Sequence, residues 1–254
     1  FNIEDAHPSP AKALNHGVRL ARSRIVCPVI DGARMASPGL LKSGLDIAER
    51  DDNAFVATLS FHLGEKLQQI AVTEGYNQQV EDELIRGIGW PANGYRLFEI
   101  AAPGGSSKNA WFGTISESNS PILSKRLFRA LGGFDERFDI PGGGFVNLDF
   151  LTRAISQQWV KYYLIVGEAT FHQFHGGVTT SRHVQKREAD GETTYSKYAG
   201  QYKQLRGVDY KHPERKPTLY GTFTAASAEI AAVGIGNYIE ELEERRRRQR
   251  RRRG

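Results

Sequence analysis

The residues best suited to chemistry stand beside two glycine clusters. Gly132-Gly133 and Gly142-Gly143-Gly144 bracket an acidic turn, and Asp149 follows where an apolar periodicity begins that predicts a helix. Glycines of this kind permit positive φ and let the backbone approach a ligand closely. A carboxylate at such a loop–helix junction is suited to act as a general base. It is equally suited to cap the helix, and the spacing alone leaves both interpretations open.

A second group of candidates follows a short apolar run at residues 25–30. Asp31 ends this run, which predicts a buried strand, and Arg34 stands in the loop predicted after it. A carboxylate at the end of a strand can hold a ribose or a divalent cation, and a guanidinium pairs well with phosphate. The alternative for Asp31 is a structural role in which it caps the next turn.

Two histidines and a tryptophan complete the set of candidates. His172 and His175 lie three residues apart, directly before Gly176-Gly177. Histidine can ligate a metal or donate a hydrogen bond to phosphate, and the alternative is that both rings are only structural. Trp111 is suited to stack against a sugar ring, and its alternative is a place in the core.

The charge of the sequence is concentrated at its C-terminal end. Eight of the last ten residues are arginine, and subtracting them from the net charge of +5 leaves −3 for the body. A mildly acidic body argues against a nucleic-acid-binding domain, so nucleic acid is not an expected partner. The acidic run at 240–244 leads into the arginines, which predicts a charged helix whose order of charges suits the helix dipole. The tail is either a solvated end or a contact with an anionic membrane surface.

The single cysteine, Cys27, excludes internal disulfides and fits a reducing compartment. No apolar run approaches the roughly 20 residues that a membrane helix needs. We therefore expect a cytoplasmic protein, which would be peripheral at the inner membrane face if the arginines contact lipid.

Helical and strand-like patterns alternate along the sequence, which predicts an α/β layer structure. Helices are predicted at 11–21, 40–50 and 122–131, strands at 55–63 and 159–166, and weaker strands at 95–101 and 111–118. Three parts are expected. Residues 1–180 form the core, residues 181–235 form a tyrosine-rich extension of helix and loop that packs on it, and residues 236–254 form a charged helix with the arginine tail.

Three motifs occur in a characteristic order over roughly residues 7–180. The first is Asn15-His16-Gly17, followed by the apolar run that ends at Asp31. The second is Leu131-Gly132-Gly133-Phe134-Asp135-Glu136-Arg137-Phe138, followed by the glycine cluster and the helix that holds Arg153. The third is the histidine–glycine segment from His172 to Gly177. Together they resemble the family-2 glycosyltransferases of the GT-A fold.

The resemblance implies a GT-A-like, Rossmann-like mixed sheet flanked by helices. It also implies that a sugar is moved with inversion from a nucleotide-sugar donor to a hydroxyl of a polysaccharide, glycolipid or similar acceptor. Members of the family normally begin with two strand–helix units that hold the nucleotide base, and no room for them precedes Asn15. Either the chain is a piece of a longer protein or its nucleotide-binding part is atypical.

The motifs assign roles to the candidate residues. Asp149 is the expected catalytic base. The donor diphosphate is expected beside Asp31, Arg34, His172 and His175. The acceptor side is expected to comprise Asp135, Asn147, Gly143, Gly144 and Trp111.

Two departures from the family pattern bear on this assignment. Ala33 replaces the second acid of the usual Asp-x-Asp metal pair, so a divalent cation such as Mn²⁺ or Mg²⁺ would be held by Asp31 and His175, or else Arg34 would neutralise the diphosphate directly. Asn147 stands where an acid is usual, and an amide cannot act as a base. The alternative is therefore a degenerate, non-catalytic GT-A domain that binds carbohydrate or serves as a scaffold. A third hypothesis, an arginine-tailed nucleic-acid binder, is opposed by the acidic body.

Overall fold

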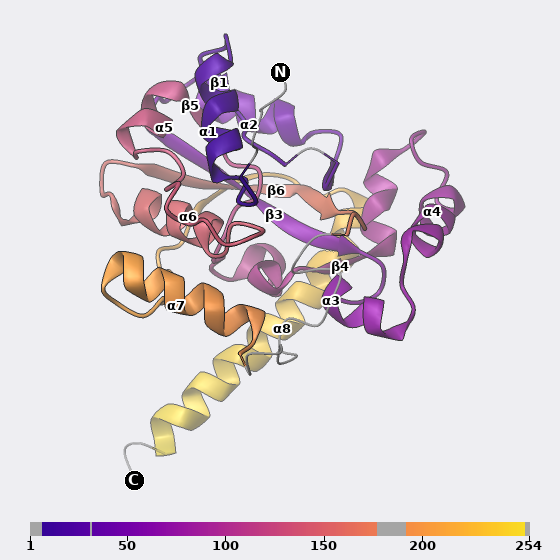
Figure 1. The fold of residues 1–254 in the computed structure, drawn as a ribbon. Coiled ribbons are helices and arrows are strands. Elements are labelled where there is room, and N and C mark those ends of the chain that lie inside the picture. Colours follow the sequence, from indigo (N-terminus) through magenta and orange to yellow (C-terminus); the bar gives the residue numbers. More distant parts are fainter. Residues whose placement is uncertain (1–6, 31, 177–191, 252–254) are drawn as a thin grey trace.

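The structure, a computed structural model, describes residues 7–30, 32–176 and 192–251. A seven-stranded mixed sheet runs through the centre of the protein (Figure 1). Its main path is β1 (Ile25–Val26), β5 (Ile122–Ser124), β3 (Ala54–Leu63), β6 (Lys161–His172) and β2 (Arg34–Ala36); β4 (Ala101–Pro103) pairs with β3, and β7 (Thr218–Gly221) pairs with β6. The β3–β6 and β6–β7 pairs are parallel, and the other pairs are antiparallel.

The two long central strands bring polar residues to one edge of the sheet. Because β3 and β6 are parallel, their carboxyl ends meet, and His62 lies opposite His172 in the register. On the other side of β6, Arg34 of β2 is also opposite His172. Three residues that are far apart in the sequence therefore stand side by side at this edge.

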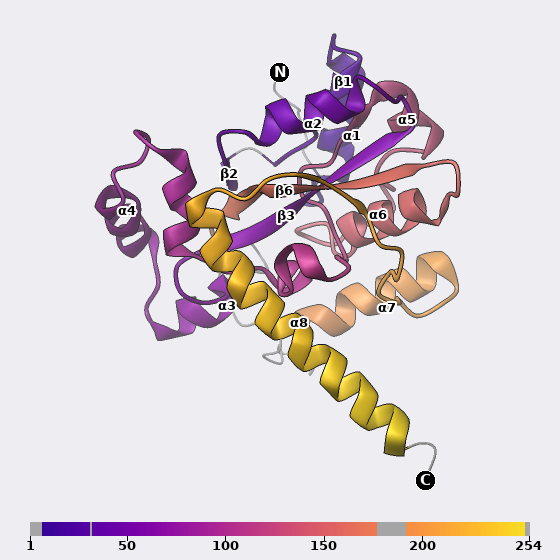
Figure 2. The ribbon, with the colours of Figure 1, turned by 180° about the vertical axis from the view of Figure 1, so that it is seen from behind.

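Helices cover both faces of the sheet. In Figures 1 and 2, α2 (Leu40–Ala48) lies above the sheet, while α6 (Val146–Ser156) and α7 (Thr194–Arg206) lie below it. Every residue of β3 except His62 is buried, as expected for a strand covered on both faces. The remaining α-helices are α1 (Ala11–Leu20), α3 (Gln68–Ala71), α4 (Gln78–Gly87), α5 (Lys125–Ala130) and α8 (Ala225–Arg251).

The predicted elements with long apolar patterns are confirmed, and the short ones need correction. The helices at 11–21 and 40–50 and the strand at 55–63 appear as α1, α2 and β3. The segments at 95–101 and 111–118, predicted as strands, are mainly 3₁₀ turns and loop, with β4 beginning only at Ala101. The predicted helix at 122–131 begins with strand β5, which pairs with β1 and β3. The helix α5 starts only at Lys125, where Ser124 caps it by accepting a hydrogen bond from the Leu127 N–H.

The loop predicted at 32–38 also contains a strand, β2, which pairs with the end of β6. The strand predicted at 159–166 continues as β6 to His172. This extension carries His172 to the carboxyl edge of the sheet.

The C-terminal part packs on the core and then leaves it. Tyr198 and Tyr202 of α7 are buried against Phe145, in agreement with a core role for the tyrosine stripe. Strand β7 joins the sheet, and α8 runs continuously across the boundary expected at residue 235. Gly234 lets α8 approach closely, since a Cβ there would clash with Ala110 and the backbone of Asn109.

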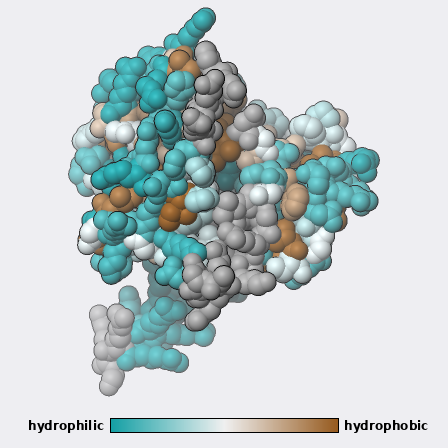
Figure 3. All heavy atoms as spheres, in the orientation of Figure 1, coloured by the Kyte–Doolittle hydropathy of each residue, from teal (hydrophilic) through white to brown (hydrophobic). Residues whose placement is uncertain are grey.

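The far end of α8 projects from the body (Figure 2) and has a hydrophilic surface (Figure 3). Its arginines Arg245, Arg247 and Arg248 form ion pairs with glutamates one turn earlier, at Glu241, Glu243 and Glu244. Such exposed pairs stabilise an isolated helix by about 0.3–0.5 kcal/mol each. Among the described helices, none combines the length and the apolar character that crossing a membrane requires.

Candidate functional site

A cavity of about 480 Å³ opens at the edge of the sheet where β2, β3 and β6 meet. Of the predicted site residues, Arg34, His172, His175, Asn147 and Gly144 line it. They come from the three separate sequence motifs or the loops that follow them. His62, Ser106, Glu117 and Asn119 line the same cavity and were not predicted from the sequence.

Arg34 supplies the positive charge of the cavity. Its guanidinium donates a hydrogen bond to the Ser60 hydroxyl at 2.6 Å. Burial lowers the pKa of Arg34 to about 10, and the carboxylate of Glu117 acts in the opposite direction. Arg34 therefore stays charged at neutral pH, and among the described residues its hydrogen-bond partner is the Ser60 hydroxyl.

Three histidines lie beside Arg34. The rings of His62 and His172 are stacked with centroids 5.3 Å apart, and the Nε2 atoms of His172 and His175 are 3.1 Å apart. Burial, followed by the charge of Arg34, lowers the pKa of His172 to about 2 and that of His62 to about 4, and it lowers the pKa of His175 as well. The imidazoles are thus neutral at pH 7, which is the form that binds metals.

The opposite wall of the cavity carries a carboxylate and two amides. Glu117 accepts a hydrogen bond from the Ser106 hydroxyl at 3.1 Å. Asn147, at the start of α6, donates to the Asn119 side-chain oxygen at 2.7 Å, and the Asn119 Nδ2 is buried without a partner among the described residues. The only sequence signal for this wall is the polar run Ser116-Glu117-Ser118-Asn119-Ser120, which stands between apolar segments.

The residues present fit a divalent cation in part. Two nitrogens that each lie 2.0–2.1 Å from a metal stand about 3 Å apart, which matches the His172–His175 pair. Asp31, the predicted third ligand, lies outside the described residues, but its neighbours Ile30 and Ala33 line the cavity. Within the described ranges, no group of three His, Cys, Asp or Glu side chains could hold a metal ion.

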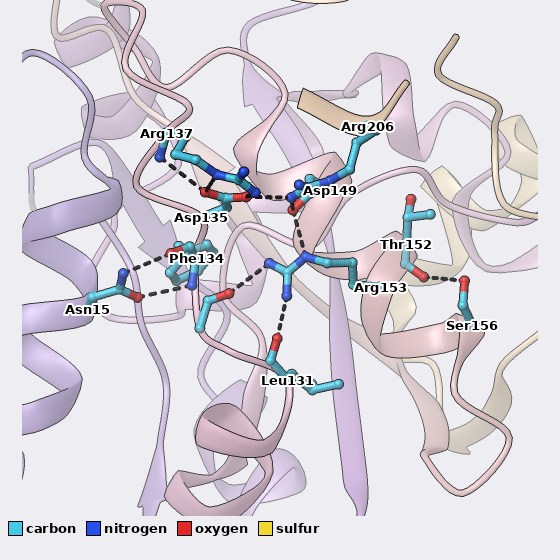
Figure 4. Close-up of polar contacts among 11 residues, drawn as sticks. Asn15, Leu131, Phe134, Asp135, Arg137, Asp149, Thr152, Arg153, Ser156 and Arg206 are labelled. Atoms are coloured by element: carbon cyan, nitrogen blue, oxygen red, sulfur yellow. Dashed lines mark hydrogen bonds and ion pairs between the residues drawn. The ribbon is translucent and has the colours of Figure 1, made fainter. Parts of the chain in front are cut away.

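Asp149, the predicted base, lies elsewhere, in an ion-pair cluster with Asp135, Arg137, Arg153 and Arg206 (Figure 4). Its side chain is 1% exposed. Arg206 Nε binds one carboxylate oxygen at 2.6 Å, and Arg153 Nε binds the other at 2.7 Å. Arg206 also bonds Asp135 at 2.8 Å. A carboxylate that is buried and bonded to two arginines in this way has both oxygens occupied and is not open to a ligand.

The ion-pair cluster fixes the glycine-bracketed turn to the rest of the core. Arg153 donates to the carbonyl oxygens of Leu131 and Gly133, and the latter distance is 2.7 Å. Asn15 of the first motif bonds both the N–H and the carbonyl of Phe134, at 3.0 and 2.8 Å (Figure 4). The acidic turn and the first motif therefore hold each other in place.

A second cavity, of about 710 Å³, lies over this turn and is lined by Asp135, Glu136, Arg137, Arg153 and Arg206 among others. It shares no lining residue with the histidine-lined cavity. Asp135, predicted on the acceptor side, is thus placed with Asp149 and not with Asn147. Arg137 and Arg206 hold the pKa of Asp135 well below its usual range.

Two further predicted residues do not line the histidine-lined cavity. Gly143 has φ +81°, and a Cβ there would press on Pro10 and Val146, so this glycine is required by the packing of the loop. Trp111 is corrected from a sugar platform to a core residue, because it is only 2% exposed. Its indole N–H donates to the Ile165 carbonyl at 2.7 Å, and its ring packs against Phe61 and Phe223.

Comparison with known proteins names no family. A scan against models of known protein families finds no match, and a search of curated proteins finds no significant relative. The function must therefore be argued from the fold and from the residues of the cavity.

Proposed function

We propose that the protein is a nucleotide-sugar-dependent glycosyltransferase with a GT-A-like fold and that the histidine-lined cavity is its transfer site. The observation that carries the proposal is that residues from three separate motifs line this one cavity. The strand ends contribute Arg34 and His172, the loop before α6 contributes Gly144, and the first turn of α6 contributes Asn147. The mixed α/β sheet suits the proposal, since ligands of such sheets bind at the carboxyl ends of parallel strands.

The donor side of the reaction needs compensation for the negative charge that develops on the leaving diphosphate. Arg34 is suited to this role because its guanidinium can form paired hydrogen bonds with phosphate oxygens. His62, His172 and His175 stand beside it as neutral hydrogen-bonding groups. If a divalent cation takes part, His172 and His175 would hold it together with Asp31, and it would supply further charge compensation to the diphosphate.

The acceptor side needs a base that removes the proton of the attacking hydroxyl. The sequence motifs assign this role to Asp149, whose burial and two arginines argue for a structural role. Glu117 has neither obstacle, since it is only half-buried, lines the cavity and, among the described residues, accepts its hydrogen bond from the Ser106 hydroxyl. We therefore place Glu117 as the base, with Asn147 and Asn119 as contacts for the acceptor.

An alternative is a non-catalytic domain that binds carbohydrate or serves as a scaffold. It is favoured by Ala33 and Asn147, which stand where the resembling family carries acids. The two hypotheses differ in whether the cavity turns over a donor or only holds it. They therefore predict different results for wild-type protein incubated with donor and acceptor.

The experiment is a release assay with a panel of uridine, guanosine and thymidine diphosphate sugars, each with and without Mn²⁺. Mixed oligosaccharides serve as acceptors, and the liberated nucleoside diphosphate is measured. The proposal predicts release that depends on acceptor and is lost in Arg34→Gln. Nucleotide-sugar binding without release would support the non-catalytic alternative, and neither binding nor release would overturn both.

A further inference from the structure

Behind the histidine pair lies a buried chain of hydrogen bonds that none of the sequence motifs contains. Glu81 of α4 and Gln68 of α3 are both fully buried. Glu81 accepts hydrogen bonds from the Tyr76 hydroxyl at 2.9 Å and from the backbone N–H of Phe174, which lies 3.0 and 2.9 Å from its two oxygens. This chain therefore anchors the segment that joins His172 to His175.

The orientation of the Gln68 amide follows from its neighbours. One end of the amide lies 3.3 Å from Glu81 Oε2 and 3.4 Å from the backbone carbonyl oxygen of His172. A backbone carbonyl can only accept a hydrogen bond, so this end must be the donating NH₂ group. The other end, Oε1, then faces His172 Nδ1 at 2.7 Å.

This orientation decides the tautomer of His172. Because Gln68 Oε1 can only accept, His172 Nδ1 must carry the proton and donate it. In the neutral ring, Nε2 is then left with its lone pair, and this is the atom that lies 3.1 Å from His175 Nε2.

Gln68 also determines the tautomer of His62, whose ring is stacked on that of His172, and this tautomer is the opposite one. The backbone N–H of Gln68 donates to His62 Nδ1 at 3.1 Å, so neutral His62 carries its proton on Nε2. Gln68 thus makes Nε2 of His62 a hydrogen-bond donor and Nε2 of His172 an electron-pair donor, and both residues line the cavity. Two stacked histidines in opposite tautomers are suited to different tasks.

We propose that Gln68, anchored by Glu81, is a positioning residue that holds His172 as the Nδ1–H tautomer, so that His172 and His175 present paired Nε2 atoms to a divalent cation. A metal-bound histidine almost always donates its other ring N–H to a carbonyl, carboxylate or water, and Gln68 Oε1 is such a carbonyl. The tautomer is independent of the proposed function. Only the assignment of the cation to the donor diphosphate rests on that function.

The first experiment measures the tautomers directly on the full chain, with ¹⁵N-labelled histidine and long-range ¹H–¹⁵N correlation spectra. We expect His172 protonated on Nδ1 and His62 protonated on Nε2. Gln68→Met removes the acceptor at similar volume and should move the His172 proton to Nε2, in part or fully. Gln79→Met, a change at an exposed position of α4 outside the cavity, should leave both tautomers unchanged.

The tautomer claim is overturned if wild-type His172 carries its proton on Nε2, or if Gln68→Met keeps it on Nδ1. The wild-type spectrum alone shows which nitrogen of His172 carries the proton. The tautomer claim can therefore be tested even if Gln68→Met folds poorly. Assignments come from the spectra of His62→Gln, His172→Gln and His175→Gln.

The second experiment titrates Zn²⁺ alone, followed by the same spectra and by calorimetry. We expect the Nε2 signals of both His172 and His175 to shift. We also expect Gln68→Met to weaken binding about 10–100-fold, while Gln79→Met leaves it unchanged. If the Nε2 signals of His172 and His175 do not shift when Zn²⁺ is added, the metal claim is overturned. Neither readout uses a donor or an acceptor, so zinc binding here without any nucleotide binding would count against the proposed function alone.

Discussion

Two charged regions of this protein differ in how their charges are balanced. In the ion-pair cluster, the carboxylates of Asp135 and Asp149 are both bonded to arginines. In the histidine-lined cavity, Arg34 bonds a hydroxyl, Glu117 bonds a hydroxyl, and the imidazoles are neutral. Groups that satisfy one another stabilise the fold, whereas groups left unbalanced in a cavity remain able to act on a ligand. We therefore propose a structural role for the ion-pair cluster and a role in ligand binding and chemistry for the histidine-lined cavity.

The largest expected effect is on catalysis by Glu117. Glu117→Gln should lower the transfer rate by about 10²–10⁴-fold, because general-base catalysis is worth that much. The free energy of unfolding should change by no more than about 0.5 kcal/mol, since the side chain bonds only Ser106 in the described structure. Rate measurements and urea unfolding on the same preparation check both parts. Full activity would remove Glu117 from the mechanism.

Asp149→Asn should show the reverse behaviour, because its main effect is expected on stability and not on the transfer step. Removing the buried carboxylate takes the ion-pair partner of Arg153 away and leaves Arg206 paired with Asp135 alone, which costs about 3–5 kcal/mol. Urea unfolding measures this cost. The matched control is Asp46→Asn, which breaks the exposed pair with Lys42 and should leave the free energy of unfolding nearly unchanged. A variant as stable as the wild type but inactive would restore Asp149 as the base.

Asp135 should make the stability depend on pH in acid. Arg137 and Arg206 lower the folded pKa of Asp135 below its ordinary value of 3.8. Such a carboxylate contributes stability above the unfolded pKa, and this contribution is lost as the pH falls below about 4 toward the folded pKa. Asp135→Asn should therefore flatten the curve of unfolding free energy between about pH 5 and pH 2. Parallel curves for the two proteins would show that the ion pairs do not stabilise the turn.

The smallest effect is expected at Trp111. Trp111→Phe removes the hydrogen bond to the Ile165 carbonyl and should cost about 1 kcal/mol of stability. The KM for the acceptor should stay the same, because the ring lies in the core. Thermal unfolding and acceptor titrations test this prediction. A raised KM with unchanged stability would return Trp111 to the acceptor site.

The sequence predicts the parts of the fold that carry a long local pattern. The apolar periods of α1, α2 and β3 identify these elements without tertiary information. Strand β5 has only three residues, too few to show a period, and only its pairing with β1 and β3 makes it a strand. The 3₁₀ segments before β4 and after Lys108 escape prediction for the same reason.

The residues of the candidate site also fall into those that a local sequence pattern identifies and those that it does not. Arg34 and the two histidines could be found because they stand next to recognisable motifs. Glu117 carries no motif, and Gln68 bonds His172 across 104 positions of sequence. The spacing of the sequence also does not show that Asp149 forms an ion pair with Arg206, which lies 57 residues further along the chain. Pairing over such distances is decided by how the elements pack, and a local pattern does not contain it.

The most direct test of the central claim is nucleotide binding measured on two matched arginine variants. Arg34→Gln removes the guanidinium of the histidine-lined cavity, and Arg129→Gln removes an exposed one that lines the second cavity. Calorimetry with UDP, GDP and dTDP should show that at least one binds the wild type. That binding should weaken about tenfold or more in Arg34→Gln, as expected for a lost charged hydrogen bond, and stay unchanged in Arg129→Gln. Equal binding by both variants, or loss only in Arg129→Gln, would contradict the account.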